Sequence, residues 1–146
     1  MAKKFKLDSV LKYRNTLEDQ AQQALAISVQ KQRELLAGMD ELQKELQEQD
    51  RQLKLRQQEG LTIAEIDLYE GRIGHCRRRC AELKAELQQL EQQILNQRES
   101  LLQAARDREV LDKLKERQEA EFRQDQDRKE RTQMDEISLR NKRNMP

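Results

Sequence analysis

The sequence predicts an all-α protein in which the chain folds as a long antiparallel two-helix coiled coil, an α-helical hairpin. Three observations support this fold class. Charged residues make up 39% of the 146 residues and aromatic residues 3%, which is too little apolar material for one compact core. Glu, Gln, Leu, Arg, Lys and Ala dominate the composition, and all of them favour helices. Apolar residues recur at alternating spacings of three and four, with one break near Gly60.

The first helix is expected from about Asp8 to Gln58. An apolar stripe, called the seam below, follows the 3-4 spacing through its second half: Leu35, Met39, Leu42, Leu46, Gln49 and Leu53. Upstream the seam continues through Leu7, Leu11, Ala21 and Leu25, interrupted by the polar residues Arg14, Glu18, Ser28 and Gln32. Because these polar residues weaken the packing, we expect the end with both chain termini to be looser than the end near Gly60.

A turn is predicted at about residues 59–62. Gly60 follows the last seam residue of the first helix, and glycine tolerates the left-handed backbone that ends many helices. Thr62 and Glu65 form the capping-box pattern, in which the Thr62 side chain accepts a hydrogen bond from the Glu65 amide and the Glu65 side chain returns one. A helix end, a short spacer and a helix start together predict a tight hairpin.

The second helix is expected from about residue 63 to residue 139. Twelve of its 14 seam positions are apolar or nearly so: Ile66, Tyr69, Ile73, Cys76, Cys80, Leu83, Leu87, Leu90, Ile94, Gln97, Leu101, Ala104, Arg108 and Leu111. The 3-4 alternation averages 3.5 residues, which is the repeat of a left-handed coiled coil. One hairpin domain of residues 1–146 follows from this pattern.

The two predicted helices differ in length. In a hairpin that turns at Gly60, the first helix ends opposite about residue 115, which leaves a C-terminal overhang of about 116–146, with a helical part about 35 Å long at 1.5 Å per residue. The overhang has few apolar residues: Phe122, Met134, Ile137 and Leu139. A single helix of this kind is marginal in water, so we expect the overhang to fray or to dock on a partner.

The segment HCRRRC is the one cluster that suggests a metal site. His75, Cys76 and Cys80 lie within six residues, but zinc prefers four ligands and the chain has no other Cys or His. Cys76 and Cys80 are also successive seam positions, which favours packing as small apolar residues. We therefore expect neither a metal nor a cofactor.

Basic residues gather near the predicted turn at Arg72 and Arg77–Arg79. A solvated helix face is the simpler interpretation, and a docking patch for an acidic partner is the alternative. Gly71 and Gly74 lie inside the predicted helix and are not followed by the Lys-Ser/Thr of a phosphate loop. A two-helix coil also offers no large concavity, so we expect no enzyme activity.

The net charge of +1 argues against nucleic-acid binding, which needs a basic surface. No window approaches the roughly 18 apolar residues of a membrane span, and the N-terminal segment has no apolar run typical of a signal peptide. Without an export signal, both cysteines are expected to be reduced. The sequence thus predicts a cytoplasmic protein without direct membrane insertion.

Three segments in order resemble the FliJ family, the small coiled-coil component of the flagellar type III export apparatus. They are FKLDSVLKYRNTLEDQAQQALA from Phe5 to Ala26, GLTIAEIDLYEGRI from Gly60 to Ile73, and EVLDKLKERQEAEF followed by MDEISL near the C-terminus. The chain length also agrees, and the resemblance covers essentially the whole chain.

The resemblance implies a hairpin similar to the central stalk of rotary ATPases. It implies that the end with both termini binds and promotes the hexameric flagellar export ATPase, and that the hairpin part binds the cytoplasmic domain of the export-gate membrane protein. Export chaperones are further implied partners, and these contacts would place the protein at the inner membrane in support of flagellum assembly and motility.

Carried over by position, the implied ATPase-binding candidates are Leu7, Leu11, Leu111, Leu114, Arg117, Asp135, Glu136 and Ile137. The implied gate-binding candidates are Leu42, Tyr69, Arg72 and Ile73. Arg72 departs from the family pattern, in which an aromatic residue is common at this position. A further expectation is that the overhang gains helical order when the ATPase covers it.

Two alternatives remain open at this point. The equivalent stalk protein of a virulence type III secretion system needs the same hairpin. A generic parallel dimeric coiled-coil scaffold would make Gly60 only a kink, in a dimer about 200 Å long, whereas the hairpin predicts a monomer about half that length.

Overall fold

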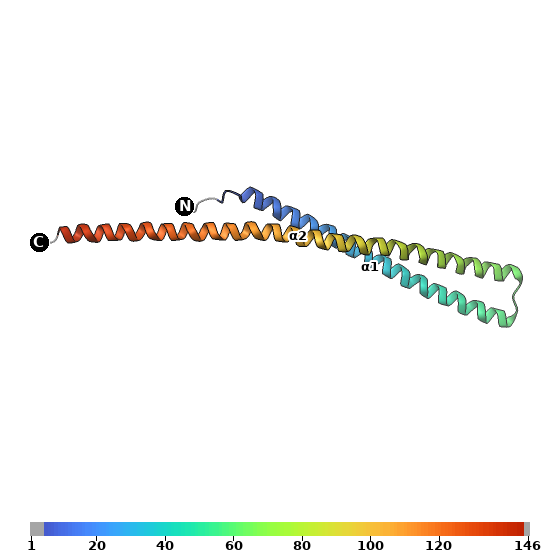
Figure 1. Cartoon of the computed structure of the whole chain (residues 1–146). Helices are drawn as coiled ribbons and strands as arrows, with labels where there is room; N and C mark the ends of the chain where they lie inside the picture. Colours follow the sequence, from blue (N-terminus) through green and yellow to red (C-terminus); the bar gives the residue numbers. More distant parts are fainter. Residues whose placement is uncertain (1–4, 145–146) are drawn as a thin grey trace. The chain divides into compact units, whose positions relative to one another are not determined.

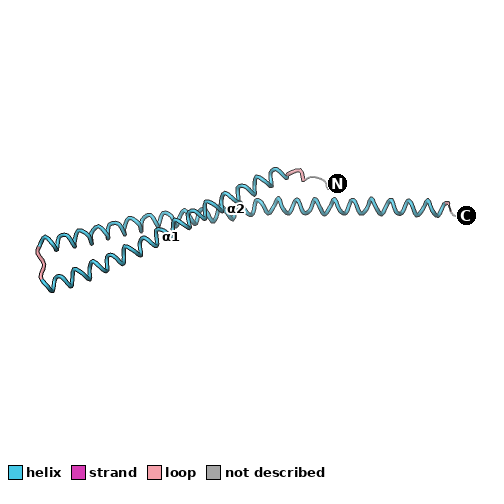
Figure 2. Tube along the Cα trace, turned by 180° about the vertical axis from the view of Figure 1, so that it is seen from behind, coloured by secondary structure: helices cyan, strands magenta, loops and turns pink. Residues whose placement is uncertain are grey.

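The computed structural model describes residues 5–144 and consists of two helices, α1 (Asp8–Glu59) and α2 (Ile63–Arg143) (Figure 1). No strand occurs in this part of the chain. The two helices pack against each other, joined by a short loop (Figure 2), which confirms the all-α hairpin. The alternative of a parallel dimer with Gly60 as a kink is therefore wrong.

The second helix extends further than the sequence predicted, because it ends at Arg143 rather than at about residue 139. Its last turn carries Arg140, Lys142 and Arg143. Positive side chains stabilise the carboxyl end of a helix through its dipole, and this explains the additional turn. The first helix ends at Glu59, one residue beyond the prediction.

Contacts divide the chain into two compact units, and each helix contributes to both. Unit 1 comprises residues 1–20 and 101–146, of which 5–20 and 101–144 are described, and unit 2 comprises residues 21–100. Unit 2 contains the turn and the middle of the sequence, whereas unit 1 contains the two terminal segments. The single-domain organisation expected from the sequence stays a prediction.

The turn in unit 2 follows the predicted chemistry with one difference. Gly60 adopts a φ of 95°, the left-handed conformation expected after a helix end. The Glu65 amide donates to Thr62 Oγ1 at 3.2 Å, as predicted. The predicted return bond from the Glu65 side chain is wrong, because its carboxylate instead accepts a hydrogen bond from Arg56 of α1 (Nη2–Oε2, 3.3 Å). The positive charge of Arg56, nine residues earlier, thus replaces the Thr62 backbone amide as the partner of the Glu65 carboxylate.

Two glycine-to-alanine substitutions should change stability in opposite directions. Gly60→Ala should lower the free energy of unfolding by about 1–2 kcal/mol, since a side chain is strained at this φ. Gly71→Ala is the matched control: nothing lies within 4 Å of an added Cβ, and we expect a gain of about 0.5–1 kcal/mol from helix propensity. Urea unfolding followed by circular dichroism measures both. A stabilised Gly60→Ala variant would contradict the assigned turn.

In unit 2 the predicted seam forms the core. Every α2 seam position from Ile66 to Gln97 is buried or half-buried, and the deepest are Ile73, Cys76, Leu83, Leu90 and Ile94. The α1 seam positions opposite them are half-buried, and Ser28, predicted to interrupt the packing, is itself buried. Gly38 lies beside this seam, where an added Cβ would be 3.8 Å from Leu83 Cδ1. The 3.5-residue repeat is confirmed here.

In unit 1 the seam continues beyond the predicted range. Phe5 and Leu11 are buried, and α2 residues remain half-buried up to Phe122. Leu7, predicted as a seam residue, is 41% exposed because it lies in a turn before α1, where the Asp8 amide donates to the Phe5 carbonyl at 3.1 Å. The fully exposed stretch of α2 thus begins at residue 123 rather than at about 116.

Candidate partner-binding surfaces

The polar residues that interrupt the seam of unit 1 form ion pairs between its two helical segments. Arg14 Nη1 lies 3.4 Å from Asp107 Oδ2. Arg108 donates through Nε to Glu18 of α1 and through Nη1 to Asp112 of its own helix, the latter at 2.6 Å.

A third pair joins Lys115 Nζ to Asp8 Oδ1 at 3.5 Å. Arg14 and Glu18, expected from the sequence as polar interruptions of the seam, are thus each paired with an oppositely charged residue of α2. The 3-4 spacing brings residues of opposite charge on the two segments into reach, so the interruptions are compensated across the seam.

Arg108 is the centre of this network. Its hydrogen bonds to Glu18 and then to Asp112 raise the pKa of the guanidinium above its ordinary value, so Arg108 stays charged at every physiological pH. Only 15% of the Glu18 side chain is exposed. A carboxylate in that position needs its cationic partner, because burying an unpaired charge is costly.

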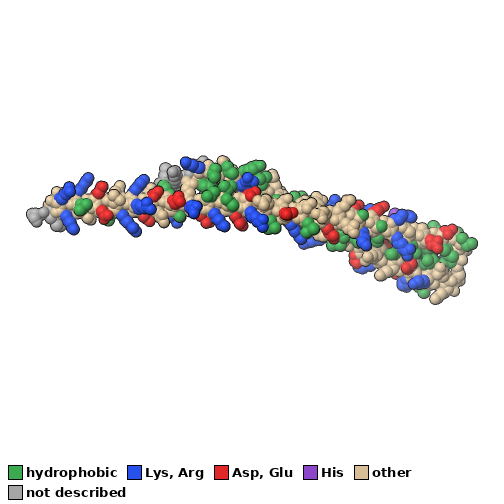
Figure 3. All heavy atoms as spheres, in the orientation of Figure 1, with side chains coloured by type: hydrophobic (Ala, Val, Ile, Leu, Met, Phe, Trp, Pro, Cys, Tyr) green, Lys and Arg blue, Asp and Glu red, His purple; other side chains and the backbone are tan. Residues whose placement is uncertain are grey.

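One side of unit 1 carries exposed apolar residues. Val10 and Tyr13 on α1, and Val110 and Leu114 on α2, are between 39% and 60% exposed. By their place in the 3-4 repeat all four lie on the same flank of the seam, and Leu7 is exposed next to them in sequence. We call these five residues the apolar flank. Figure 3 shows hydrophobic side chains gathered over the first turns of α1.

The C-terminal part of α2, residues 123–143, has every residue exposed. Its large apolar side chains, Met134, Ile137 and Leu139, are between 52% and 66% exposed. A helix stabilised by tertiary packing normally buries an apolar face, and this segment buries none within unit 1. It is therefore a surface available to a partner.

The structure places the implied ATPase-binding residues in two different settings. Leu7, Leu114, Arg117, Asp135, Glu136 and Ile137 are exposed. Leu11 is 5% exposed and Leu111 is half-buried, so both belong to the seam of unit 1. Sequence reasoning missed Val10, Tyr13 and Val110. The available signal was their apolar character just outside the seam, at positions that are usually polar.

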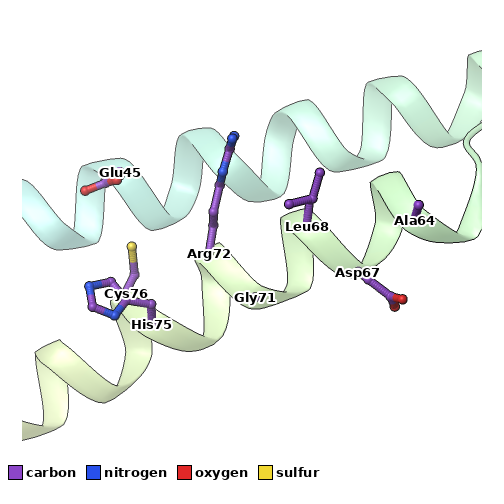
Figure 4. A pocket seen from close by; sticks show the side chains of 8 residues that line it. All are labelled: Glu45, Ala64, Asp67, Leu68, Gly71, Arg72, His75 and Cys76. Carbon is purple, nitrogen blue, oxygen red and sulfur yellow. The ribbon is translucent and has the colours of Figure 1, made fainter.

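Two grooves lie along unit 2. The first has a volume of about 650 Å³ and is lined by Glu45 of α1 and, on α2, by Ala64, Asp67, Leu68, Gly71, Arg72, His75 and Cys76 (Figure 4). In Figure 4 the Arg72 side chain points from α2 toward α1, and Leu68 points the same way. Leu68 is 62% exposed, and Gly71 leaves the groove open because it has no side chain.

The second groove is smaller, about 420 Å³, and lies over Gly38 and Leu42 beside Arg79. The implied gate-binding residues are thus distributed between core and surface. Arg72 is exposed and Leu42 lines the second groove, whereas Tyr69 is half-buried and Ile73 is buried. Tyr69 and Ile73 are seam residues that support the surface rather than form it.

The two cysteines of the HCRRRC segment pack in the seam, as their spacing predicted. Cys76 is 3% exposed in the seam, Cys80 is half-buried and His75 is exposed. Among residues 5–144, no three His, Cys, Asp or Glu side chains are grouped so that they could hold a metal ion. Burial, and then the electrostatic influence of Glu45 and of the neighbouring Cys80, raise the pKa of the Cys76 thiol.

The two cysteines should therefore differ in reactivity. With iodoacetamide at pH 8, we expect Cys76 to be alkylated at least about tenfold more slowly than Cys80, because its thiol is buried and a raised pKa leaves less thiolate. Peptide mass spectrometry over time measures both sites. In concentrated urea the two rates should converge, and equal rates in the folded protein would contradict the packing described.

A comparison with protein families decides the assignment. The model of the family described as Flagellar FliJ protein matches residues 3–145. The chain belongs to the FliJ family. Neither the curated proteins nor the solved structures contain a match to this chain. FliJ family membership confirms the resemblance, and it favours the flagellar system over the virulence secretion system.

Membership in the FliJ family makes this chain a component of the flagellar export apparatus. The FliJ family is a family of structural proteins. Between residues 5 and 144, neither helix has a stretch apolar enough to span a bilayer.

Proposed function

We propose that this protein is the stalk of the flagellar export apparatus, and that unit 1 and the exposed C-terminal helix bind the hexameric export ATPase. The observation that supports this most directly is the exposed apolar surface of unit 1. The apolar flank and residues 123–143 both lie in unit 1, while the corresponding positions of unit 2 are mainly polar or charged, with Ile27, Leu55 and Leu68 as the exposed apolar exceptions.

The charges on the exposed helix of residues 123–143 support a ring-shaped partner. The exposed helix mixes acidic and basic residues, with Asp135 and Glu136 beside Ile137 and a basic last turn from Arg140 to Arg143. This helix presents isolated apolar residues among charges of both signs. It is better suited to a site lined by several subunits than to a single flat apolar interface. The ATPase hexamer supplies such a site.

The apolar flank is tested by matched substitutions. Tyr13→Ser and Val110→Ser should each weaken binding to the purified ATPase at least about tenfold, since exposed apolar anchors dominate the energy of such contacts. Leu102→Ser is the control: Leu102 is 58% exposed on α2 of unit 1 but lies on the other flank of the seam. We expect less than about a twofold change for it. Co-purification and ATPase stimulation measure the effects.

An equal loss for all three variants, or none for any of them, would contradict the assignment of the apolar flank. Circular dichroism of each variant controls for folding. All three side chains are exposed, so the helix content should not change.

Unit 2 is the proposed contact for the export gate and the export chaperones. The first groove, with Arg72 on its wall and Leu68 exposed, is the surface we assign to the gate protein's cytoplasmic domain. This arrangement would place the protein on the cytoplasmic side of the inner membrane through its partners, as a monomer. Loss of gate binding in Arg72→Glu, with ATPase binding retained, would support two separate contact surfaces.

A further inference from the structure

We propose that unit 1 opens on its own: residues 8–20 of α1 separate from residues 101–122 of α2 while the seam of unit 2 stays paired. Such an opening is a conformational device built into the hairpin. It follows from the way in which the two units are stabilised, and it does not depend on the function proposed above.

The two units differ in the apolar burial that stabilises them. In unit 2, α2 contributes five buried side chains to the seam: Ile73, Cys76, Leu83, Leu90 and Ile94. In unit 1, none of the α2 residues from 101 to 122 reaches the same burial. The buried apolar residues of this unit are Phe5, just before α1, and Leu11 in α1. Because local stability follows buried apolar contacts, unit 1 should open at lower free energy than unit 2.

Ion pairs replace the missing apolar contacts in unit 1. The side chains of Arg14 and Asp107 are 39% and 37% exposed, and that of Lys115 is 39% exposed. Pairs this accessible to water add little stability and are screened by salt. The opening should therefore become easier as the salt concentration rises.

The same ion pairs make closing specific. Arg108 meets Glu18 between the helices and Asp112 within α2, so the network forms in one register of the two segments. Charged residues at seam positions select a register at a cost in stability. Unit 1 thus combines an easily opened seam with one correct way to close it.

Opening would expose the seam residues Leu11 and Leu111. Both are implied in ATPase binding, yet in the closed unit they are buried and half-buried. An open state makes them accessible to a partner subunit. This use of the opening, unlike the opening itself, rests on the proposed function.

Hydrogen exchange of the full chain tests the opening directly. In low salt, amides of residues 12–20 and 101–115 should exchange at least about tenfold faster than those of residues 73–94, because an unpaired helix of this composition is marginal in water. In about 0.5 M NaCl the exchange of unit 1 should accelerate further, and that of unit 2 should not. Equal protection of the two units, or exchange in unit 1 that ignores salt, would overturn the proposal.

A variant that removes the charges should close unit 1. In Glu18→Leu/Arg108→Leu, apolar side chains replace the central pair, and exchange in unit 1 should slow at least about tenfold. Arg108→Ala should accelerate it, since Glu18 loses its partner. Arg79→Ala is the matched control, because it removes an exposed pair with Glu82 in unit 2, and exchange in unit 1 should not change. A closed variant that exchanges as fast as the original chain would overturn the proposal.

ATPase binding by the closed variant separates the two ideas. Slowed exchange with weaker ATPase binding supports both the opening and its use. Slowed exchange with unchanged ATPase binding shows that the ATPase does not need the open state, and it leaves the opening itself supported. If the original chain binds no ATPase, the proposed function fails, and the exchange result decides the opening independently.

Discussion

Replacing Leu90 with alanine should lower the free energy of unfolding by about 2–3 kcal/mol. Leu90 is 6% exposed in the unit 2 seam, and the substitution removes apolar contacts and leaves a cavity between two helices. A two-helix seam can partly collapse around the cavity, which keeps the loss in the lower part of the usual range. Urea unfolding monitored by circular dichroism measures the change.

Leu95→Ala is the control for this prediction. Leu95 lies five residues further along α2 and is 58% exposed, so its loss should change stability by no more than about 0.5 kcal/mol. The contrast between two leucines on one helix isolates burial from helix propensity. Similar losses for both variants would show that the seam does not run where the structure places it.

Removal of residues 123–146 should abolish stimulation of the export ATPase while leaving the hairpin folded. Every described residue after Phe122 is exposed, so the truncation removes no buried contact and should change the unfolding free energy by less than about 0.5 kcal/mol. Stimulation should fall at least about tenfold, because the proposed contact includes Met134 and Ile137.

A shorter deletion makes this test sharper. Removal of residues 134–146 takes away the three exposed apolar residues near the C-terminus and leaves residues 123–133. We expect it to reproduce most of the loss. Full stimulation by the shorter chain would contradict docking through this segment, and reduced helix content upstream of residue 122 would show that the truncation disturbs the hairpin instead.

Much of the fold could be predicted from the sequence because a coiled coil repeats its packing rule every seven residues. The α2 seam from Ile66 to Leu111 is buried or half-buried at every predicted position, including the polar Gln97 and Arg108. Gly60 and the bond from the Glu65 amide to Thr62 were also predictable, since they depend on a few neighbouring residues.

Interactions between distant residues were harder to predict. The Glu65 side chain pairs with Arg56 rather than with its own helix start, and Glu18 pairs with Arg108, 90 positions away. Such choices depend on the register and rotation of two helices, which the repeat alone does not fix. Leu7 is exposed and Phe5 is buried for a similar reason: the chain turns before α1, where the helical spacing no longer applies.

The candidate site was only partly accessible from the sequence. The resemblance indicates positions such as Leu11 and Leu114 without distinguishing a core residue from a surface residue, and burial makes that distinction. Val10 and Tyr13 of the apolar flank were missed because they have ordinary neighbours in sequence. They form a surface only together with Val110 and Leu114, which lie about 100 residues later in the chain.

The tight turn at Gly60 has a consequence for the order of folding. The Arg56–Glu65 pair closes a loop of nine positions, whereas the Asp8–Lys115 pair joins residues 107 positions apart. Because the entropy lost on closing a loop grows with its length, pairing should start beside the turn and proceed like a zipper toward the termini. During synthesis on the ribosome, the first turns of α1 are thus the last part of that helix to find a partner, because α2 must first be made as far as about Lys115.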